Sequence, residues 1–205
     1  MNENQDSITK QTISYEQQLW KKFQQGDEKA LSSIYSIYFH QLYDYGYRFT
    51  SDAALVEDCI QELFIKLIRN KTNLSLPDSL KAYLFRSLRS LMFDSLEKQK
   101  KYSSAEINEK IEFDLEGHAE STMIRDEETA ERNNKLLSAI QQLTPRQREA
   151  IFLKYQEGLS YPEIAELLSL SQKATYKLIG RAIHALRSIT ISALLLSQVL
   201  STINT

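Results

Sequence analysis

Two helix-start signals of the same kind stand sixteen residues apart in the second half of the chain and fix where its helices begin. Thr144 is followed three residues later by Gln147, and Ser160 is followed three residues later by Glu163. Each pair predicts a capping box, in which the two side chains satisfy backbone N–H groups at the start of a helix. The chain from residue 143 to 187 must therefore be divided into short helices with defined ends.

Three helices follow from these signals, and their arrangement predicts a helix-turn-helix. Gly158 ends the first helix, Ser160 begins the second and Ser171 caps the third. On a helical wheel the third helix has an apolar arc that should pack inward. That arc holds Ala174, Thr175, Leu178, Ile179, Ala182, Ala185 and Leu186. The opposite arc is basic, and it holds Lys173, Tyr176, Lys177, Gly180, Arg181, His184 and Arg187. A basic face of this kind suits the major groove of DNA, although a merely solvated face would look the same.

The composition predicts an all-α protein of two small helical domains. The 205 residues include five glycines, three prolines and a single cysteine, so no disulfide can form within the chain. The three histidines lie far apart, and no glycine-rich phosphate loop is present. We therefore expect a cytoplasmic protein that is no enzyme, with no metal site, no cofactor and no small-molecule substrate. Residues 1–15 are polar and are expected to be a disordered extension.

The N-terminal half predicts a four-helix bundle over residues 16–102. Its expected helices are 16–25, a long helix opened by Asp27, 53–69 and 80–101. In the third of these, Ile65 points outward among carboxylates and is a candidate docking residue, although single exposed apolar residues are common. The fourth helix interleaves basic and aromatic residues, a pattern typical of single-strand DNA capture. Tyr83, Phe85 and Phe93 are its candidate stacking rings, although Phe85 can also face the bundle.

Two further segments have distinct compositions. Residues 103–132 carry ten acidic and three basic side chains without a helical stripe, and we predict a flexible acidic linker over 103–130. The second domain should then occupy 131–188. The apolar tail 189–205 is too short to span a bilayer, so we expect it to extend the third helix of the helix-turn-helix. Basic residues exceed acidic ones by seven to four in 145–188 and by six to two in 79–102, although the whole chain has a net charge of −2.

The run QLTPRQREAIFLKYQEGLSYPEIAELLSLSQKATYKLIGRAIHALR resembles region four of the extracytoplasmic-function (ECF) group of sigma-70 type RNA polymerase sigma factors. The resemblance implies that this domain reads the upstream promoter element. The residues expected to do so are Lys173, Tyr176, Lys177, Arg181 and His184. Two departures are Ser169, where a glycine is common in the turn, and Leu178, near a position where many relatives carry arginine.

The run VEDCIQELFIKLI resembles the segment of sigma region two that binds the clamp of the polymerase largest subunit. By that resemblance Phe64 is a core residue. The expected polymerase-binding residues are Asp58, Gln61, Glu62 and Ile65.

The loop 70–78 and the run YLFRSLRSLMFD resemble the parts of region two that hold and melt the downstream promoter element. A bare connecting loop is the alternative for 70–78. The residues expected to act here are Asn70, Lys71, Thr72, Asn73, Arg86, Arg89, Ser90, Phe93 and Lys98. Ser90 stands where the family usually has asparagine, and a hydroxyl cannot offer the separate donor and acceptor of an amide.

These resemblances imply a sigma factor that binds core RNA polymerase and directs it to one class of promoter DNA. They also imply an anti-sigma partner, which in this family is often membrane-bound. The alternatives are a free-standing helix-turn-helix regulator and a sigma-like protein that binds polymerase without initiating. The N-terminal half argues against a response regulator, because it predicts helices where such a protein needs strands and an acidic pocket.

Overall fold

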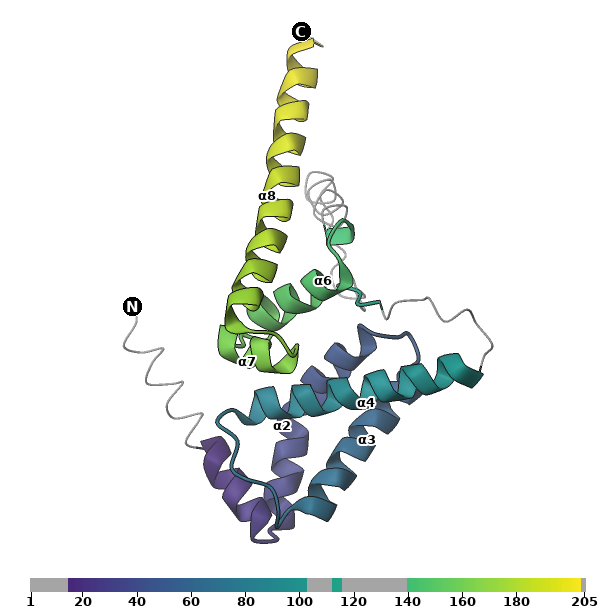
Figure 1. Cartoon of the computed structure of the whole chain (residues 1–205), viewed down its shortest axis with the longest axis vertical. Coiled ribbons are helices and arrows are strands. Elements are labelled where there is room, and N and C mark those ends of the chain that lie inside the picture. Colours follow the sequence, from purple (N-terminus) through teal and green to yellow (C-terminus); the bar gives the residue numbers. More distant parts are fainter. Residues whose placement is uncertain (1–14, 103–111, 116–139, 204–205) are drawn as a thin grey trace. The chain divides into compact units, whose positions relative to one another are not determined.

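The computed structural model describes residues 15–102, 112–115 and 140–203. All regular structure in these ranges is helical, which confirms the predicted all-α class. The chain divides into two compact units, Met1–Ile111 and Glu112–Thr205. The helices of the first unit are α2 (Glu28–Tyr47), α3 (Ala53–Asn70) and α4 (Leu80–Tyr102), preceded by helical residues 15–24. Those of the second are α6 (Pro145–Ile151), η1 (Phe152–Gln156), α7 (Tyr161–Leu167) and α8 (Gln172–Ile203), as Figure 1 shows.

Short polar side chains start the helices of the first unit where the sequence predicts them. Asp27 and Asp52 adopt extended backbone conformations and accept hydrogen bonds from the first turns of α2 and α3. The sequence left Asp78 and Ser79 as alternatives for the start of α4. Ser79 is the capping residue, because its Oγ accepts a hydrogen bond of 3.2 Å from the N–H of Ala82.

The core of the first unit lies where α2, α3 and α4 meet. Gly46 of α2 permits the closest approach, because a Cβ added there would lie 2.7 Å from Cγ1 of Val56 in α3. The predicted apolar arc of α3 is confirmed by burial, including Phe64, which is 6 % exposed. The most completely buried large side chains of this unit are Trp20, Ile34, Leu42, Tyr45, Ile60, Leu63, Leu84, Phe85, Leu88 and Met92.

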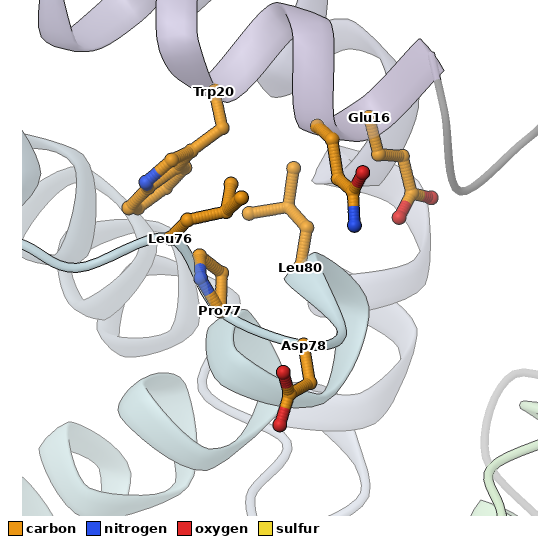
Figure 2. A pocket seen from close by; sticks show the side chains of 7 residues that line it. Glu16, Trp20, Leu76, Pro77, Asp78 and Leu80 are labelled. Carbon is orange, nitrogen blue, oxygen red and sulfur yellow. The ribbon is translucent and has the colours of Figure 1, made fainter.

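The loop before α4 packs against the helical residues 15–24. The Gln24 amide donates a hydrogen bond to the carbonyl oxygen of Leu74, and the Tyr38 hydroxyl donates one to the carboxylate of Glu16. Between the loop and this helix lies a small pocket, shown in Figure 2. Its lining residues are Glu16, Gln17, Trp20, Leu76, Pro77, Asp78 and Leu80. The loop is therefore fastened to the bundle at its C-terminal half.

The second unit starts its helices with the two predicted capping boxes, both of which are present. Gly158 has a φ of +72°, so it ends the first helical segment as expected. That segment is not one uniform α-helix, however. After Ile151 the backbone widens into the π-turn η1, in which the N–H of Glu157 bonds to the carbonyl of Phe152 at 3.1 Å.

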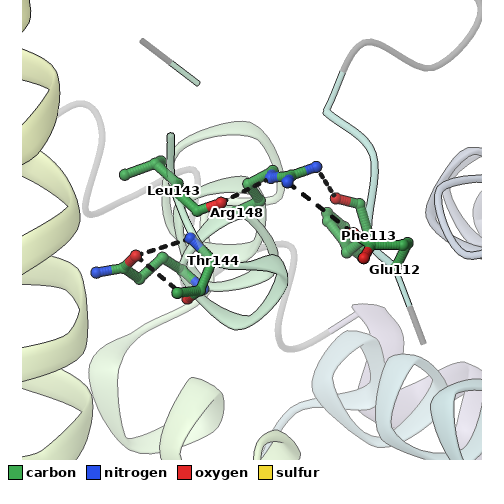
Figure 3. Close-up of polar contacts among 6 residues, drawn as sticks. Glu112, Phe113, Leu143, Thr144 and Arg148 are labelled. Atoms are coloured by element: carbon green, nitrogen blue, oxygen red, sulfur yellow. Dashed lines mark hydrogen bonds and ion pairs between the residues drawn. The ribbon is translucent and has the colours of Figure 1, made fainter. Parts of the chain in front are cut away.

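Part of the segment between the predicted domains packs on the second unit. The ring of Phe113 is 1 % exposed and meets the ring of Phe152 edge-on, with centroids 5.7 Å apart. Figure 3 shows how Arg148 fixes the backbone there: its Nη1 donates to the Phe113 carbonyl at 3.1 Å, and its Nε donates to the Leu143 carbonyl at 3.1 Å. Its Nη2 also lies 4.0 Å from the Glu112 carboxylate. The described residues 112–115 are therefore anchored, whereas the rest of the linker predicted over 103–130 lies outside the described residues.

The last helix is continuous from the turn of the helix-turn-helix to Ile203. This confirms that the apolar tail extends the third helix. None of the helices described here is both long enough and apolar enough to cross a membrane. The expected extension 1–15 lies outside the described residues except for Tyr15, as does most of the helix predicted before Leu143.

Candidate nucleic-acid interface

The turn between α7 and α8 is held from three sides. Ser169 has a φ of +52°, the conformation for which a glycine is usually required. Ser171 accepts a hydrogen bond of 3.2 Å from the N–H of Ala174 and so caps α8. Arg146 of α6 reaches across to the turn, where its Nη2 donates to the carbonyl of Leu168 at 2.7 Å. These contacts set the direction in which α8 leaves the turn.

The two arcs predicted for α8 are confirmed by burial. Thr175, Ile179 and Ala182 are buried in the second unit, and the other members of the predicted inner arc are half-buried. All seven residues of the predicted outer arc are exposed. We call this exposed set the reading face: Lys173, Tyr176, Lys177, Gly180, Arg181, His184 and Arg187. It is a continuous strip with the charge and width that major-groove binding requires.

Aromatic stacking supports the first part of the reading face. The rings of Tyr176 and Tyr161 are 4.0 Å apart and inclined by only 20°. Beneath Tyr161 lies the ammonium group of Lys154, 4.9 Å from the ring centroid. The sequence prediction missed Lys154 and Tyr161, because the stack joins residues that are far from α8 in the sequence.

The predicted melting helix α4 presents basic residues on its outer side. Arg86, Ser90 and Lys98 are exposed, while Arg89 and Phe93 are half-buried. The guanidinium carbon of Arg89 lies 4.1 Å from the centroid of the Phe93 ring. That ring in turn contacts Phe49 edge-on at 5.6 Å. Phe93 is thus held between the core and a cation, and it stands at the surface where an unpaired base could reach it.

The other two candidate rings of α4 belong to the bundle. Phe85 is fully buried against Tyr45, with ring centroids 4.9 Å apart, so stacking on a base is excluded for it. Tyr83 is half-buried, and its ring meets that of Trp20 at 5.6 Å. Helical spacing placed these rings on α4 but could not tell which of them the core would cover.

The four loop residues predicted to act on the downstream element are brought together at the end of α3. Asn70, Thr72 and Asn73 are exposed, and Lys71 is half-buried. The Asn70 amide nitrogen donates a hydrogen bond of 2.9 Å to the carbonyl of Lys66, so this side chain also ends its own helix. The N–H of Asn73 bonds to the Asn70 carbonyl at 2.8 Å, which closes the turn.

The predicted polymerase-binding residues share the outer side of α3. Asp58, Gln61 and Ile65 are exposed, and Glu62 pairs with Lys66 at 3.6 Å. Ile65 is 40 % exposed, and Ile68 one turn later is 47 % exposed. The sequence prediction did not include Ile68. The strip therefore combines carboxylates with two uncovered apolar side chains.

A row of rings lies beside this strip on α2. The rings of Tyr35 and Phe39 stack at 5.1 Å, and Tyr43 and Tyr47 continue the row with stacked pairs at 6.0 Å. Tyr35 also contacts Phe64 of α3 at 4.9 Å. His40 is exposed, and no group of three or more possible metal ligands occurs among the residues that the structure describes.

Comparison with known proteins matches both units. The family model of sigma-70 region 2 matches residues 34–102, and that of sigma-70 region 4 matches residues 133–186. A helical bundle of the region 2 type followed by a helix-turn-helix of the region 4 type defines a sigma factor. The chain belongs to the ECF group of the sigma-70 family.

Curated relatives agree over most of their length. The chain is 28% identical over 172 residues to the ECF RNA polymerase sigma factor SigW of Bacillus subtilis, covering 82% of this chain and 92% of that protein. It is 29% identical over 184 residues to the RNA polymerase sigma-H factor of Pseudomonas aeruginosa, covering 85% and 93%.

Two solved structures have a similar fold at a TM-score of 0.57 and 20% identity. One is CnrH in complex with the cytosolic domain of CnrY, with 86% of this chain and 97% of that chain covered. The other is the sigma factor RpoE of Bartonella quintana in complex with the anti-sigma factor NepR, with 79% and 97% covered.

Proposed function

We propose that this protein binds core RNA polymerase and directs it to initiate transcription at one class of promoters. The exposed reading face on a capped helix-turn-helix carries the proposal, because it occurs in one chain with a region 2 bundle. Residues 16–102 bind polymerase and open the promoter, residues 131–188 read the upstream element, and residues 103–130 link the two. Chemistry on the nucleotides belongs to the polymerase.

Three surfaces divide the work. Asp58, Gln61, Glu62 and Ile65 of α3 contact the clamp of the polymerase largest subunit. The loop residues Asn70 to Asn73, together with Arg86, Arg89, Ser90, Phe93 and Lys98 of α4, hold the downstream element after melting. Exposed cations on α4 follow the phosphates while the Phe93 ring meets an unpaired base. Lys173, Tyr176, Lys177, Arg181 and His184 read the upstream element.

An inhibitory partner is part of the proposal. Both solved structures with a similar fold are complexes, and RpoE of Bartonella quintana is bound there to the anti-sigma factor NepR. We expect an anti-sigma partner to hold this protein away from polymerase until a signal releases it.

Transcription by purified core polymerase tests the function. Discrete run-off transcripts from genomic fragments should appear only when this protein is added. Binding of duplex DNA without polymerase and without transcripts would favour a free-standing regulator. Polymerase binding without transcripts would favour a sigma-like protein that does not initiate.

Paired variants test the division of labour. Lys177→Ala with Arg181→Ala should abolish most promoter-specific transcription and leave polymerase binding unchanged, because the reading face would lose two phosphate or base contacts. Lys21→Ala with Lys22→Ala removes the same charge from another exposed site and should have no effect. Ile65→Ala should weaken polymerase binding, whereas Ile37→Ala, with the same exposed fraction of 40 %, should not. Equal effects within either pair would contradict the proposed surfaces.

A further inference from the structure

Three side chains from three elements form a layered support under the reading face. Lys154 of η1 is fixed by a hydrogen bond of 3.1 Å from its Nζ to the Leu159 carbonyl. Its ammonium group lies below the ring of Tyr161, the first residue of α7, and Tyr161 lies flat against Tyr176 of α8. One face of the Tyr176 ring is therefore covered, although the side chain as a whole is 55 % exposed. Only the edge and the opposite face of this ring can meet DNA.

A notch lies one turn beyond Tyr176 on the same face of α8. A Cβ added at Gly180 would have no heavy atom within 4 Å apart from its chain neighbours and the backbone of its own helix, so packing does not require a glycine there. Tyr176 precedes Gly180 by four residues and the exposed His184 follows it by four, so the two side chains flank the notch. A group on the floor of the groove can approach the helix backbone between them.

The walls of the notch determine which group fits. One wall is the apolar edge of an aromatic ring, and the floor is a glycine without a side chain. In the major groove, the C5-methyl of thymine is the apolar group that base edges present, and aromatic or methyl-bearing side chains contact it. We propose that the Gly180 notch receives a thymine methyl of the upstream element, and that Tyr161 is the positioning residue that holds the Tyr176 ring as its wall. This inference rests on the proposed function, because it assigns a base to the proposed reading face.

Replacing thymine by deoxyuridine tests the contact, since this change removes only the methyl group. Duplexes that bind the complex of full-length protein and core polymerase are first selected from a random library, and the selected thymines of the upstream element are replaced one at a time. At one position the replacement should weaken binding about fourfold, as expected for one buried methyl group. In Tyr161→Ala and Gly180→Ala the ratio between the two duplexes should fall to about one, because the ring is released or the notch is filled.

Tyr161→Phe is the matched control, because it keeps the stacked ring and should keep the fourfold ratio. A simple folding defect would weaken binding to both duplexes without changing their ratio. The inference is overturned if no thymine is selected, if no replacement changes binding, or if Tyr161→Ala leaves the ratio unchanged. Transcription that depends on the protein would still stand in those cases. Absence of any promoter-dependent transcript would instead overturn the proposed function.

Discussion

Arg146 at the start of α6 is hydrogen-bonded to the carbonyl of Leu168 at the end of α7, twenty-two residues later, at 2.7 Å. A cation at this position also interacts favourably with the negative end of the α7 dipole. The contact connects the first helix of the helix-turn-helix directly to the turn that precedes the reading face. Arg146 thus contributes to the orientation of α8 without belonging to its surface.

Loss of this contact should destabilise the second unit. Arg146→Ala is expected to lower the free energy of unfolding by about 1 kcal/mol, because the Leu168 carbonyl loses its charged donor. Hydrogen exchange of amides in α6 and α7 measures the change in the full chain. Arg181→Ala removes an exposed arginine nearby and should alter exchange by less than about 0.5 kcal/mol. Equal values for the two variants would contradict a structural role for Arg146.

The turn before α8 should be improved by a glycine. Ser169 has a φ of +52°, and a side chain in this conformation costs about 1 kcal/mol. Ser169→Gly is therefore expected to raise the free energy of unfolding by about that amount. Ser171→Gly, two residues later, keeps an acceptable cap conformation but loses the hydroxyl acceptor, so it should lower stability by a few tenths of a kcal/mol. The same sign for both variants would contradict this account.

Two helical glycines should respond oppositely to alanine. Gly180→Ala should raise stability by about 1 kcal/mol, because the new methyl group meets open space in the middle of a helix. Gly46→Ala should lower stability by about 1 to 3 kcal/mol, because the methyl group would collide with Val56. Fluorescence of Trp20, the single tryptophan, monitors unfolding of the first unit, and hydrogen exchange monitors the second. A stable Gly46→Ala variant would show that the contact between α2 and α3 adapts easily.

The anchor at Phe113 should contribute to the stability of the second unit. Phe113→Ala is expected to lower the free energy of unfolding of that unit by about 3 kcal/mol, because a fully buried ring leaves a cavity against Phe152. Glu112→Ala is the control, since its carboxylate is 69% exposed and only 4.0 Å from Arg148. Hydrogen exchange around α6 distinguishes the two. Unchanged exchange in Phe113→Ala would mean that residues 112–115 are not part of the folded unit.

The single cysteine should react slowly while the chain is folded. Burial raises the pKa of the Cys59 thiol, so the folded state retains the proton to higher pH than the unfolded state, whose pKa is about 8.5. Stability should therefore fall as pH rises above this value, and Cys59→Ala should remove that part of the slope. Labelling by an aromatic disulfide reagent at pH 8 should be at least roughly tenfold slower in the folded chain than in denaturant. Equal rates would contradict the burial.

The helices were predictable because their signals are local. Asp27 and Asp52 start helices through side chains that bond to N–H groups two or three residues away, and the capping boxes do the same at Thr144 and Ser160. The two arcs of α8 follow from helical spacing alone. Such features require no knowledge of which helix packs on which, and they were predicted with nearly correct boundaries.

The parts that sequence reasoning missed depend on tertiary contacts. Phe113 lies in an acidic segment without helical spacing, yet its ring is buried because Phe152 and Arg148 form a site for it. Tyr161 supports Tyr176 across fifteen residues of sequence. The composition of residues 103–132 gave no sign of the first contact. A tyrosine directly after the cap Ser160 was the available signal for the second.

The unbroken α8 also determines how the tail and the reading face are related. Its 32 residues form one rod of about 48 Å. Each residue turns the helix by about 100°, so the tail and the reading face are fixed in phase about a common axis. One residue inserted after Arg187 would swing the tail by about 100°, whereas four would bring it back to within about 40° of its original direction. Any partner that holds the tail therefore also sets the angle at which α8 is presented to DNA.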